Sequence, residues 1–248
     1  MRCSLRIFAV ALGLALAPRL AAAQSQELPG AYVAVKGSLG FLGSLNVQSD
    51  AKTLESNAKM PIDLAAVDEQ SDLLSAAFGF DVSYVFGVHR FFGIAPLFGI
   101  HGWHSEEAEK HGEGASIVAE VGASLQPRIP LGSRFELYAS FPLSLTLSFL
   151  NEYKTWTELQ QTDAMMLPKG TAKDVDPSYG YGLGAYVGAR YAITGRFGVL
   201  TELGYQRYAF THGVEFQISP DLDVTGIGTT LDLACVVQQF RWNIGVFF

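Results

Sequence analysis

The sequence predicts an all-β protein made of one eight-stranded antiparallel up-and-down barrel that spans a membrane. Long segments alternate between apolar and polar residues, their apolar faces carry no charge, and short and long connections alternate along the chain. A period of two places apolar side chains on one face of a strand, and a tilted strand needs about 9–11 residues to cross a bilayer. These observations favour a membrane barrel over a soluble one.

Residues 1–23 are predicted to be a signal peptide that is removed on export. Arg2 and Arg6 make the start positive, residues 7–17 (IFAVALGLALA) are apolar, and residues 21–23 are alanines that suit signal peptidase. The apolar run is shorter than the about 20 residues that a membrane helix needs. A retained N-terminal helix is the alternative. The barrel is therefore assigned to residues 24–248.

The charge balance argues against nucleic acid as a partner. The chain has 17 basic and 24 acidic residues, a formal net charge of −7, and loss of Arg2, Arg6 and Arg19 with the signal would change it to −10. Such a surface repels phosphate backbones. Cys3 would leave with the signal, so Cys235 would have no partner for an intramolecular disulfide.

The first four strands are expected at segments whose alternate residues are apolar. Leu74–Phe86 is a clear example, since its apolar residues alternate with a second face that holds Asp81 and two serines. Ile117–Leu125 follows the same pattern around Glu120, whereas Ala31–Phe41 and Phe92–Ile100 are weaker members. All four are expected to turn their apolar face to lipid.

The last four strands include the longest alternating segment. Phe135–Phe149 sustains the period of two over its fifteen residues, and Tyr179–Tyr191 sets apolar residues against four glycines, Tyr186 and Arg190. The remaining two are the weaker Phe197–Tyr205 and the C-terminal Phe240–Phe248. Aromatic residues gather at strand ends, where interfacial girdles lie, and a charge facing lipid at mid-depth costs about 2–4 kcal/mol.

The connections predict which end of the barrel faces which side. Short turns are expected at Gly87–His89, Pro130–Ser133 and Thr194–Arg196, and long polar segments at about 43–72, 103–115, 151–178 and 212–237. Outer-membrane barrels have short periplasmic turns and longer extracellular loops. The long segment after Phe149 also carries apolar residues, which could pack together or meet a partner.

A polar network is predicted in the barrel lumen from the charged residues of the polar faces. The turn positions suggest that Arg128 faces Glu136, that Arg190 faces Glu202, and that Lys36 and Arg241 are neighbours where the barrel closes. The network forms either a selectivity ring or a neutralised polar core, and we favour the core because eight strands leave an interior that side chains just fill. Its members are Lys36, Asp81, Glu120, Arg128, Glu136, Arg190, Glu202 and Arg241.

Metal binding and catalysis have weaker support in the sequence. The histidines and glutamates of HGWHSEEAEKH (His101, His104, His111, Glu106, Glu107 and Glu109) are suitable metal ligands, but a charged loop is ordinarily solvated. Adjacent His104 and Ser105 offer a base and a nucleophile, yet such residues are common in polar loops. The glycines of 182–188 continue a strand, whereas a dinucleotide-binding site requires that they begin a helix. We therefore expect no metal, no cofactor and no enzymatic activity.

The signal, the eight amphipathic strands and the ending FRWNIGVFF resemble small bacterial outer-membrane proteins, in particular the outer membrane protein A and outer membrane protein W groups. The resemblance implies that Phe248 is read by the assembly machinery of the outer membrane. Residues 221–223 (DLD) and 231–233 (LDL) resemble the W group, which implies a conduit for small hydrophobic solutes.

The resulting functional hypothesis is a narrow porin-like conduit for small hydrophobic solutes or a structural protein in the outer membrane. An adhesin that contacts host surface ligands through its loops is the alternative. A lipid-modifying enzyme at the outer rim is less favoured. Outer-membrane lipid and the assembly machinery are the expected partners.

Overall fold

The computed structural model describes residues 30–49, 52–55, 61–64, 67–106, 109, 114–149, 171–173, 178–217 and 229–248. The predicted signal peptide therefore lies outside the described residues, as does most of the segment 150–177. Within the described part of the chain, no helix has the length and hydropathy needed to cross a membrane.

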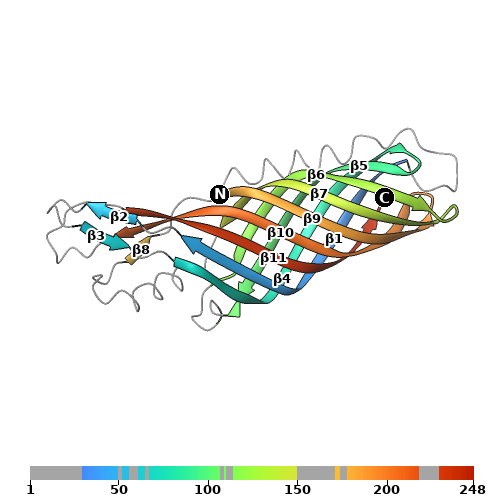
Figure 1. Ribbon diagram of the computed structural model, residues 1–248. Coiled ribbons are helices and arrows are strands. Elements are labelled where there is room, and N and C mark those ends of the chain that lie inside the picture. Colours follow the sequence, from blue (N-terminus) through green and yellow to red (C-terminus); the bar gives the residue numbers. More distant parts are fainter. Residues whose placement is uncertain are drawn as a thin grey trace, which may run out of the picture.

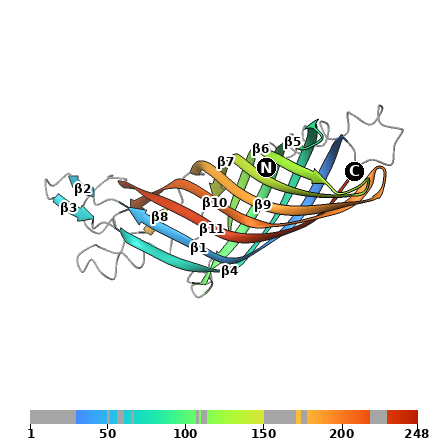
Figure 2. The ribbon, with the colours of Figure 1, turned by 45° about the vertical axis from the view of Figure 1, so that its right-hand side comes forward.

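Eight long antiparallel strands form a closed barrel (Figures 1 and 2). Each strand pairs with its neighbours along the chain, and the last strand pairs with both the first and the one before it, which closes the ring. The barrel strands are β1 (Ala31–Ser49), β4 (Val67–His89), β5 (Phe92–Ser105), β6 (Ser116–Pro130), β7 (Phe135–Phe149), β9 (Ser178–Thr194), β10 (Phe197–Gln217) and β11 (Thr229–Phe247). The eight-stranded up-and-down barrel predicted from the sequence is thus confirmed.

Three short strands lie at the end of the barrel that carries the long connections. β2 (Lys52–Glu55) and β3 (Pro61–Leu64) pair with each other, and β8 (Thr171–Lys173) pairs with the far end of β10. In Figure 1 they extend beyond the barrel on the left. We call this the long-connection end and the opposite end, which holds the three tight turns, the short-turn end.

The strands continue beyond the ranges that the sequence pattern predicts. β10 and β11 pair as far as Phe216 and Thr229, well inside the segment 212–237 that was expected to be a connection. β1 likewise reaches Ser49 and β4 begins at Val67. The prediction was wrong here because it ended each strand where the apolar outer face ends. The hydrogen bonds between strands continue past that point, since they do not depend on the side chains of that face.

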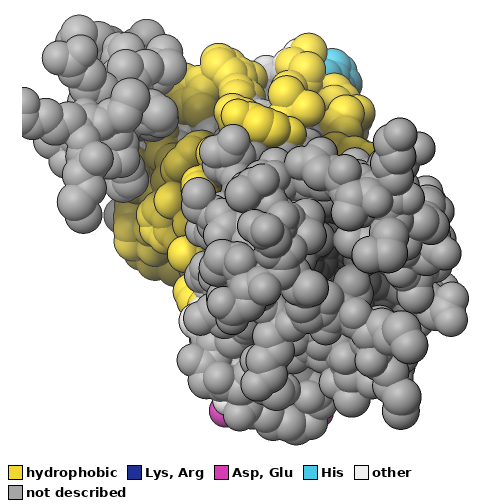
Figure 3. Space-filling view, turned by 90° about the vertical axis from the view of Figure 1, so that its left-hand side faces the viewer, with side chains coloured by type: hydrophobic (Ala, Val, Ile, Leu, Met, Phe, Trp, Pro, Cys, Tyr) yellow, Lys and Arg dark blue, Asp and Glu magenta, His cyan; other side chains and the backbone are white. Residues whose placement is uncertain are grey.

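Apolar side chains cover the outer wall of the barrel. Leu143, Leu145 and Val187 are among the large hydrophobic residues that remain exposed, on strand faces that point away from the lumen. Figure 3, which looks at the long-connection end, shows hydrophobic side chains over the part of the wall that is visible beside residues that are not described. A continuous exposed apolar surface of this kind is stable in lipid and not in water.

Strand β1 has an interruption in its pairing. In the described barrel, Leu42 and Gly43 of β1 have no cross-strand partner in either β4 or β11, and the register to β11 shifts there. Leu42 has a φ of 50°, a left-handed conformation that residues other than glycine rarely adopt. This β-bulge locally breaks the hydrogen-bonded wall.

Candidate functional site in the barrel interior

All eight charged residues of the predicted network point into the barrel. Seven of them are buried, and Lys36 has a side chain that is only 13% exposed. They alternate with lipid-facing residues along their strands because side chains of successive residues in a strand point to opposite faces. The interior therefore holds four cations and four anions, whose burial is costly unless they are paired.

The charged layer nearest the short-turn end is built around Arg190 of β9. Its guanidinium lies 2.6 Å from Glu136 on the adjacent strand β7 and stacks over the ring of Tyr32 at 4.4 Å. Tyr138 and Phe247 also flank it, each with its ring centre 6.0 Å from the guanidinium carbon. The ion pair is thus buried among aromatic rings.

The next layer joins three strands at the seam where the barrel closes. Lys36 of β1 donates to Glu202 of β10 at 3.0 Å, and Asn243 of β11 donates to the same carboxylate oxygen at 2.9 Å. Lys36 also lies opposite Asp81 in the β1–β4 register. These contacts connect the first strand to the last two across the seam.

The specific pairs expected from the turns were wrong, although the residues face the same lumen. Glu136 is opposite Arg190 in the neighbouring strand, and Arg128 is opposite Tyr138 and donates to the carbonyl of His89 at 2.8 Å. The sequence placed the centre of each turn one residue away from its observed position, and such an error moves every cross-strand partner by two residues. A shift of two keeps each side chain on its face but changes its partner.

The neighbours expected at the seam were also wrong, again because of the register. Lys36 is opposite Gly245 and Arg241 is opposite Gly40, so these two cations are separated along the β1–β11 ladder. With its side-chain amide rotated by half a turn, so that the oxygen and nitrogen exchange places, Gln239 accepts two hydrogen bonds from Arg241, at 2.9 and 2.7 Å. Arg241 also lies over the ring of Tyr208 at 5.1 Å.

A buried histidine between two carboxylates lies at the centre of the lumen. His101 Nε2 is 2.8 Å from a Glu120 oxygen and 3.1 Å from an Asp81 oxygen. Glu120 also accepts hydrogen bonds from Ser144 at 2.6 Å and from Tyr208 at 3.1 Å. The sequence pattern instead predicts His101 in a loop cluster, which is wrong. Continued alternation of β5 past Ile100 is the signal that would have placed it inside.

The three residues of this triad have the donor atoms of a metal site. The donor atoms of Asp81, His101 and Glu120 all lie within 4.8 Å of one another, and histidine with carboxylates suits Zn²⁺ or a similar cation. A divalent cation would add two positive charges to an interior in which the charges of the eight network residues already balance. The charge count therefore argues against a metal ion at the triad.

Glycines make room for the imidazole. A side chain at Gly79 or Gly99 would overlap the ring of His101, and at Gly99 it would also meet Asp81 and Glu120. The site therefore depends on two glycines that face the lumen from the strands on which Asp81 and His101 lie.

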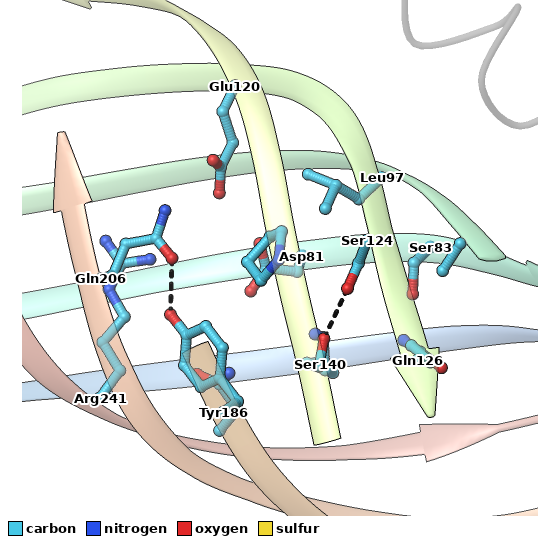
Figure 4. A pocket seen from close by; sticks show the side chains of 14 residues that line it. Asp81, Ser83, Leu97, Glu120, Ser124, Gln126, Ser140, Tyr186, Gln206 and Arg241 are labelled. Carbon is cyan, nitrogen blue, oxygen red and sulfur yellow. Dashed lines mark hydrogen bonds between the residues drawn. The ribbon is translucent and has the colours of Figure 1, made fainter. Parts of the chain in front are cut away.

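A small polar cavity adjoins the triad (Figure 4). Side chains from strands around the ring converge on it, with hydrogen bonds between Tyr186 and Gln206 at 3.0 Å and between Ser124 and Ser140 at 2.7 Å. The space in which the centre of a water molecule can move is about 20 Å³, which is enough for one or two waters. This cavity is consequently too small for a solute much larger than water.

Apolar layers lie inside the barrel on both sides of the polar one, which the sequence analysis did not predict. Toward the short-turn end, Tyr32, Val85, Leu200 and Phe247 form one buried cluster with three alanines. Toward the long-connection end, a second cluster contains Leu45, Val47, Ala77, Trp103, Val118, Tyr208, Phe210, Cys235 and Val237. The predicted polar core therefore shares the lumen with apolar layers, because in these segments both strand faces are apolar and the alternation disappears.

The candidate metal and catalytic residues of the sequence HGWHSEEAEKH are separated by the strand. Trp103 and Ser105 are buried on the inner face of β5, so the side chain of His104 points to the other face. His104 therefore does not reach Ser105 as a general base would need to. Glu106 and Glu109 are exposed, and His111 and Glu107 lie outside the described residues.

Phe248 is held at the seam by its backbone. Its amide donates to the carbonyl of Val33 at 3.0 Å, and its carbonyl accepts from the amide of Val33 at 2.9 Å. If the assembly machinery reads this residue, its deletion should reduce insertion into the outer membrane of cells far more than it lowers the urea midpoint of barrels folded in detergent. A Phe248→Tyr variant, which keeps the aromatic ring, is the control. Unchanged insertion of the deletion variant would contradict the assembly role.

Several solved structures of outer-membrane proteins are similar to this chain. The chain is similar to the outer membrane protein OprG of Pseudomonas aeruginosa, with 12% identity, coverage of 90% of this chain and 98% of that one, and a TM-score of 0.43. It is also similar to the outer membrane protein AlkL, with 14% identity, 92% and 93% coverage and a TM-score of 0.41. For the outer membrane protease OmpT of Escherichia coli the values are 12%, 90%, 99% and 0.44. No curated protein sequence matches.

A family model supplies the assignment. The family described as "Outer membrane protein beta-barrel domain" matches residues 7–233, which is most of the chain. The closed barrel of eight antiparallel strands, with its apolar outer wall, is the structure that such a match implies. The chain therefore belongs to this family of outer-membrane β-barrel proteins.

Proposed function

We propose that the protein admits small hydrophobic solutes into the apolar half of its lumen and releases them sideways into the outer membrane. The observation that carries this proposal is the apolar cluster around Trp103 and Val237, which lies inside the barrel directly beside the polar layer. Water-soluble substrates gain nothing from such a lining, whereas an apolar solute is stabilised by roughly 25 cal/mol per Å² of surface that it removes from water.

The polar layer supports a sideways exit over passage through the whole barrel. A solute in the apolar half would meet the triad of Asp81, His101 and Glu120, then the Lys36–Glu202 contact, and then Arg190 within its aromatic rings. Displacing side chains from these ion pairs would leave buried charges without partners, which costs several kcal/mol. An apolar solute cannot form ion pairs or hydrogen bonds that would replace these contacts.

The interruption of β1 supports an exit at this position. Leu42 and Gly43 lie between Gly40, which faces Ala77 of β4, and Leu45, whose side chain belongs to the apolar cluster. Leu42 is 83% exposed on the outer surface, next to the exposed Phe41. An opening here would connect the apolar lumen with the lipid without breaking a continuous ladder of hydrogen bonds.

Cross-linking this part of the wall tests the proposal. Ser44 and Leu73 are direct partners in the β1–β4 register, so Ser44→Cys with Leu73→Cys places two thiols within disulfide distance beside the interruption. We expect the oxidised variant, expressed in Gram-negative cells, to take up the hydrophobic fluorophore N-phenyl-1-naphthylamine several-fold more slowly than the wild type. Reduction should restore the rate.

A matched control uses the same two strands away from the interruption. Val35→Cys with Val82→Cys forms another direct pair nearer the short-turn end, and its oxidation should leave uptake unchanged. Uptake no faster than in cells without the barrel would contradict the conduit and favour a structural role. Fast uptake in the cross-linked variant would place the exit elsewhere.

Adhesion through the long connections is the other proposal that the sequence supports. The connection with the most apolar residues, 150–177, lies almost wholly outside the described residues, as do 218–228. The described barrel therefore supports the conduit more directly. Removal of the signal at residue 23 is part of the same proposal for export, and N-terminal sequencing of the membrane-inserted protein tests it.

A further inference from the structure

We propose that the three turns at the short-turn end bind the headgroups of anionic phospholipids. The sequence at each turn contains an arginine followed directly by a phenylalanine: Arg90–Phe91, Arg134–Phe135 and Arg196–Phe197. All six residues are exposed. This recurrence is independent of the lumen and of the passage of solutes.

The arginines are distributed around the rim of the barrel. They belong to the β4–β5, β6–β7 and β9–β10 connections, which are successive hairpins in the ring order, so three of the four sectors of the rim carry one. The fourth sector is the β1–β11 seam. The three cations are therefore presented to the membrane in different directions around the circumference.

No acidic residue accompanies these arginines within the turns. The segments 86–92 (FGVHRFF), 130–135 (PLGSRF) and 194–197 (TGRF) contain no Asp or Glu. By contrast, the four connections at the opposite end, 50–66, 106–115, 150–177 and 218–228, contain 14 acidic residues and 6 lysines. The short-turn rim is thus cationic in a chain that is acidic as a whole, which indicates a local anionic partner.

The phenylalanines set the depth at which the arginines act. Phe135 and Phe197 begin strands whose outer faces are apolar, and both rings are exposed on that wall. Aromatic side chains at strand ends lie at the level of the lipid headgroups. A guanidinium on the preceding residue is then within reach of phosphate oxygens, which it binds with paired donors. A site for a soluble acidic protein would instead direct its cations away from the bilayer, and it would not require an aromatic ring beside each cation.

Hydrogen bonds fix the backbone of each turn. The chain therefore does not have to become ordered when the arginines bind a headgroup. Thr194 Oγ1 accepts from the amides of Arg196 and Phe197 at 3.3 and 3.1 Å, and the carbonyl of Arg134 accepts from the amide of Ala192 at 2.8 Å. At the third turn, Phe91 donates its amide to the imidazole of His89, and the Arg90 guanidinium lies 4.5 Å from the centre of the Phe91 ring. A fixed backbone lowers the entropic cost of binding a headgroup.

Spin-label electron paramagnetic resonance can measure the proposed selectivity. The protein is reconstituted into phosphatidylcholine vesicles with spin-labelled phosphatidylglycerol or spin-labelled phosphatidylcholine, and the fraction of motionally restricted label gives the relative association constant. An arginine near an anionic surface contributes about 1 kcal/mol, so phosphatidylglycerol should be preferred about fivefold at each turn. The preference should fall in 1 M NaCl.

Variants assign the preference to the turns. Arg90→Gln, Arg134→Gln and Arg196→Gln together should abolish it, each single change should remove about a third, and the triple change to lysine should retain most of it. Arg207→Gln is the matched control, because Arg207 is an exposed arginine on the outer face of β10 far from these turns.

Three results would overturn the proposal. The first is equal association of both lipids with the wild type, and the second is a preference that survives in the triple glutamine variant. The third is an equal loss of preference in Arg207→Gln. If inorganic phosphate at millimolar concentration removes the preference while the same concentration of NaCl does not, the turns are phosphate sites without lipid selectivity. If an acidic soluble protein binds and the lipids do not, the partner is that protein class.

Discussion

Glu136→Gln should lower the free energy of unfolding of the barrel by roughly 3–5 kcal/mol, because it leaves the Arg190 guanidinium buried without its counterion. Arg190 is only 2% exposed and lies 2.6 Å from the Glu136 carboxylate. The rings of Tyr32, Tyr138 and Phe247 surround it, so water cannot replace the lost partner. Arg190→Met should cost a similar amount by leaving Glu136 unpaired.

Replacing both partners should recover much of this loss. Glu136→Leu with Arg190→Met removes both charges and supplies apolar groups to a layer that is already aromatic, and such exchanges are often near neutral. Urea unfolding of the single and double variants in lipid vesicles gives the coupling energy. If water filled this layer, each single change would cost only about 0–1 kcal/mol and the effects would add.

A second double-mutant cycle, on Arg190 and Glu202, separates the observed register from the one expected from the turns. In the structure Arg190 is opposite Leu200, and Glu202 instead contacts Lys36 and Asn243. We therefore expect a large coupling between Arg190 and Glu136 and a much smaller one between Arg190 and Glu202. The reverse result would show that the β9–β10 hairpin has the other register.

His101→Phe should be the other strongly destabilising change, again by roughly 3–5 kcal/mol near neutral pH. The imidazole Nε2 lies 2.8 Å from Glu120 and 3.1 Å from Asp81, so its loss leaves two buried carboxylates that face each other. Phenylalanine keeps a planar ring in the space provided by Gly79 and Gly99, which limits the effect of shape. The urea midpoint in lipid vesicles measures the loss.

A rescue variant and a surface variant make the test specific. Adding Asp81→Asn to His101→Phe should restore much of the stability, because an amide can donate a hydrogen bond to Glu120 and removes one charge. His104→Phe, on the opposite face of the same strand, should change stability by no more than about 0.5 kcal/mol. A small effect of His101→Phe, equal to that of His104→Phe, would mean that the two carboxylates are solvated.

The turn centres limited what could be inferred about the charged pairs. Local alternation assigned Glu136, Arg190 and Glu202 to the lumen, because it depends only on whether residues are an odd or even number of positions apart. Their pairing depends on where each turn is centred, and the connections 131–134 and 195–196 allow centres one residue apart. The sequence contains no local signal strong enough to choose between them, whereas the packing of a closed ring of eight strands does.

The sequence by itself determined that this chain alternates over eight segments, and hence the barrel class, the lipid-facing wall and the inward direction of the charged residues. Only the tertiary structure decided which residues meet: His101 with Asp81 and Glu120, Arg190 with Glu136, and the apolar cluster around Trp103 that lies inside the barrel. Alternation is a property of neighbours along the chain. Partners across a barrel are set by register and closure, which involve residues as far apart in the chain as Val33 and Phe248.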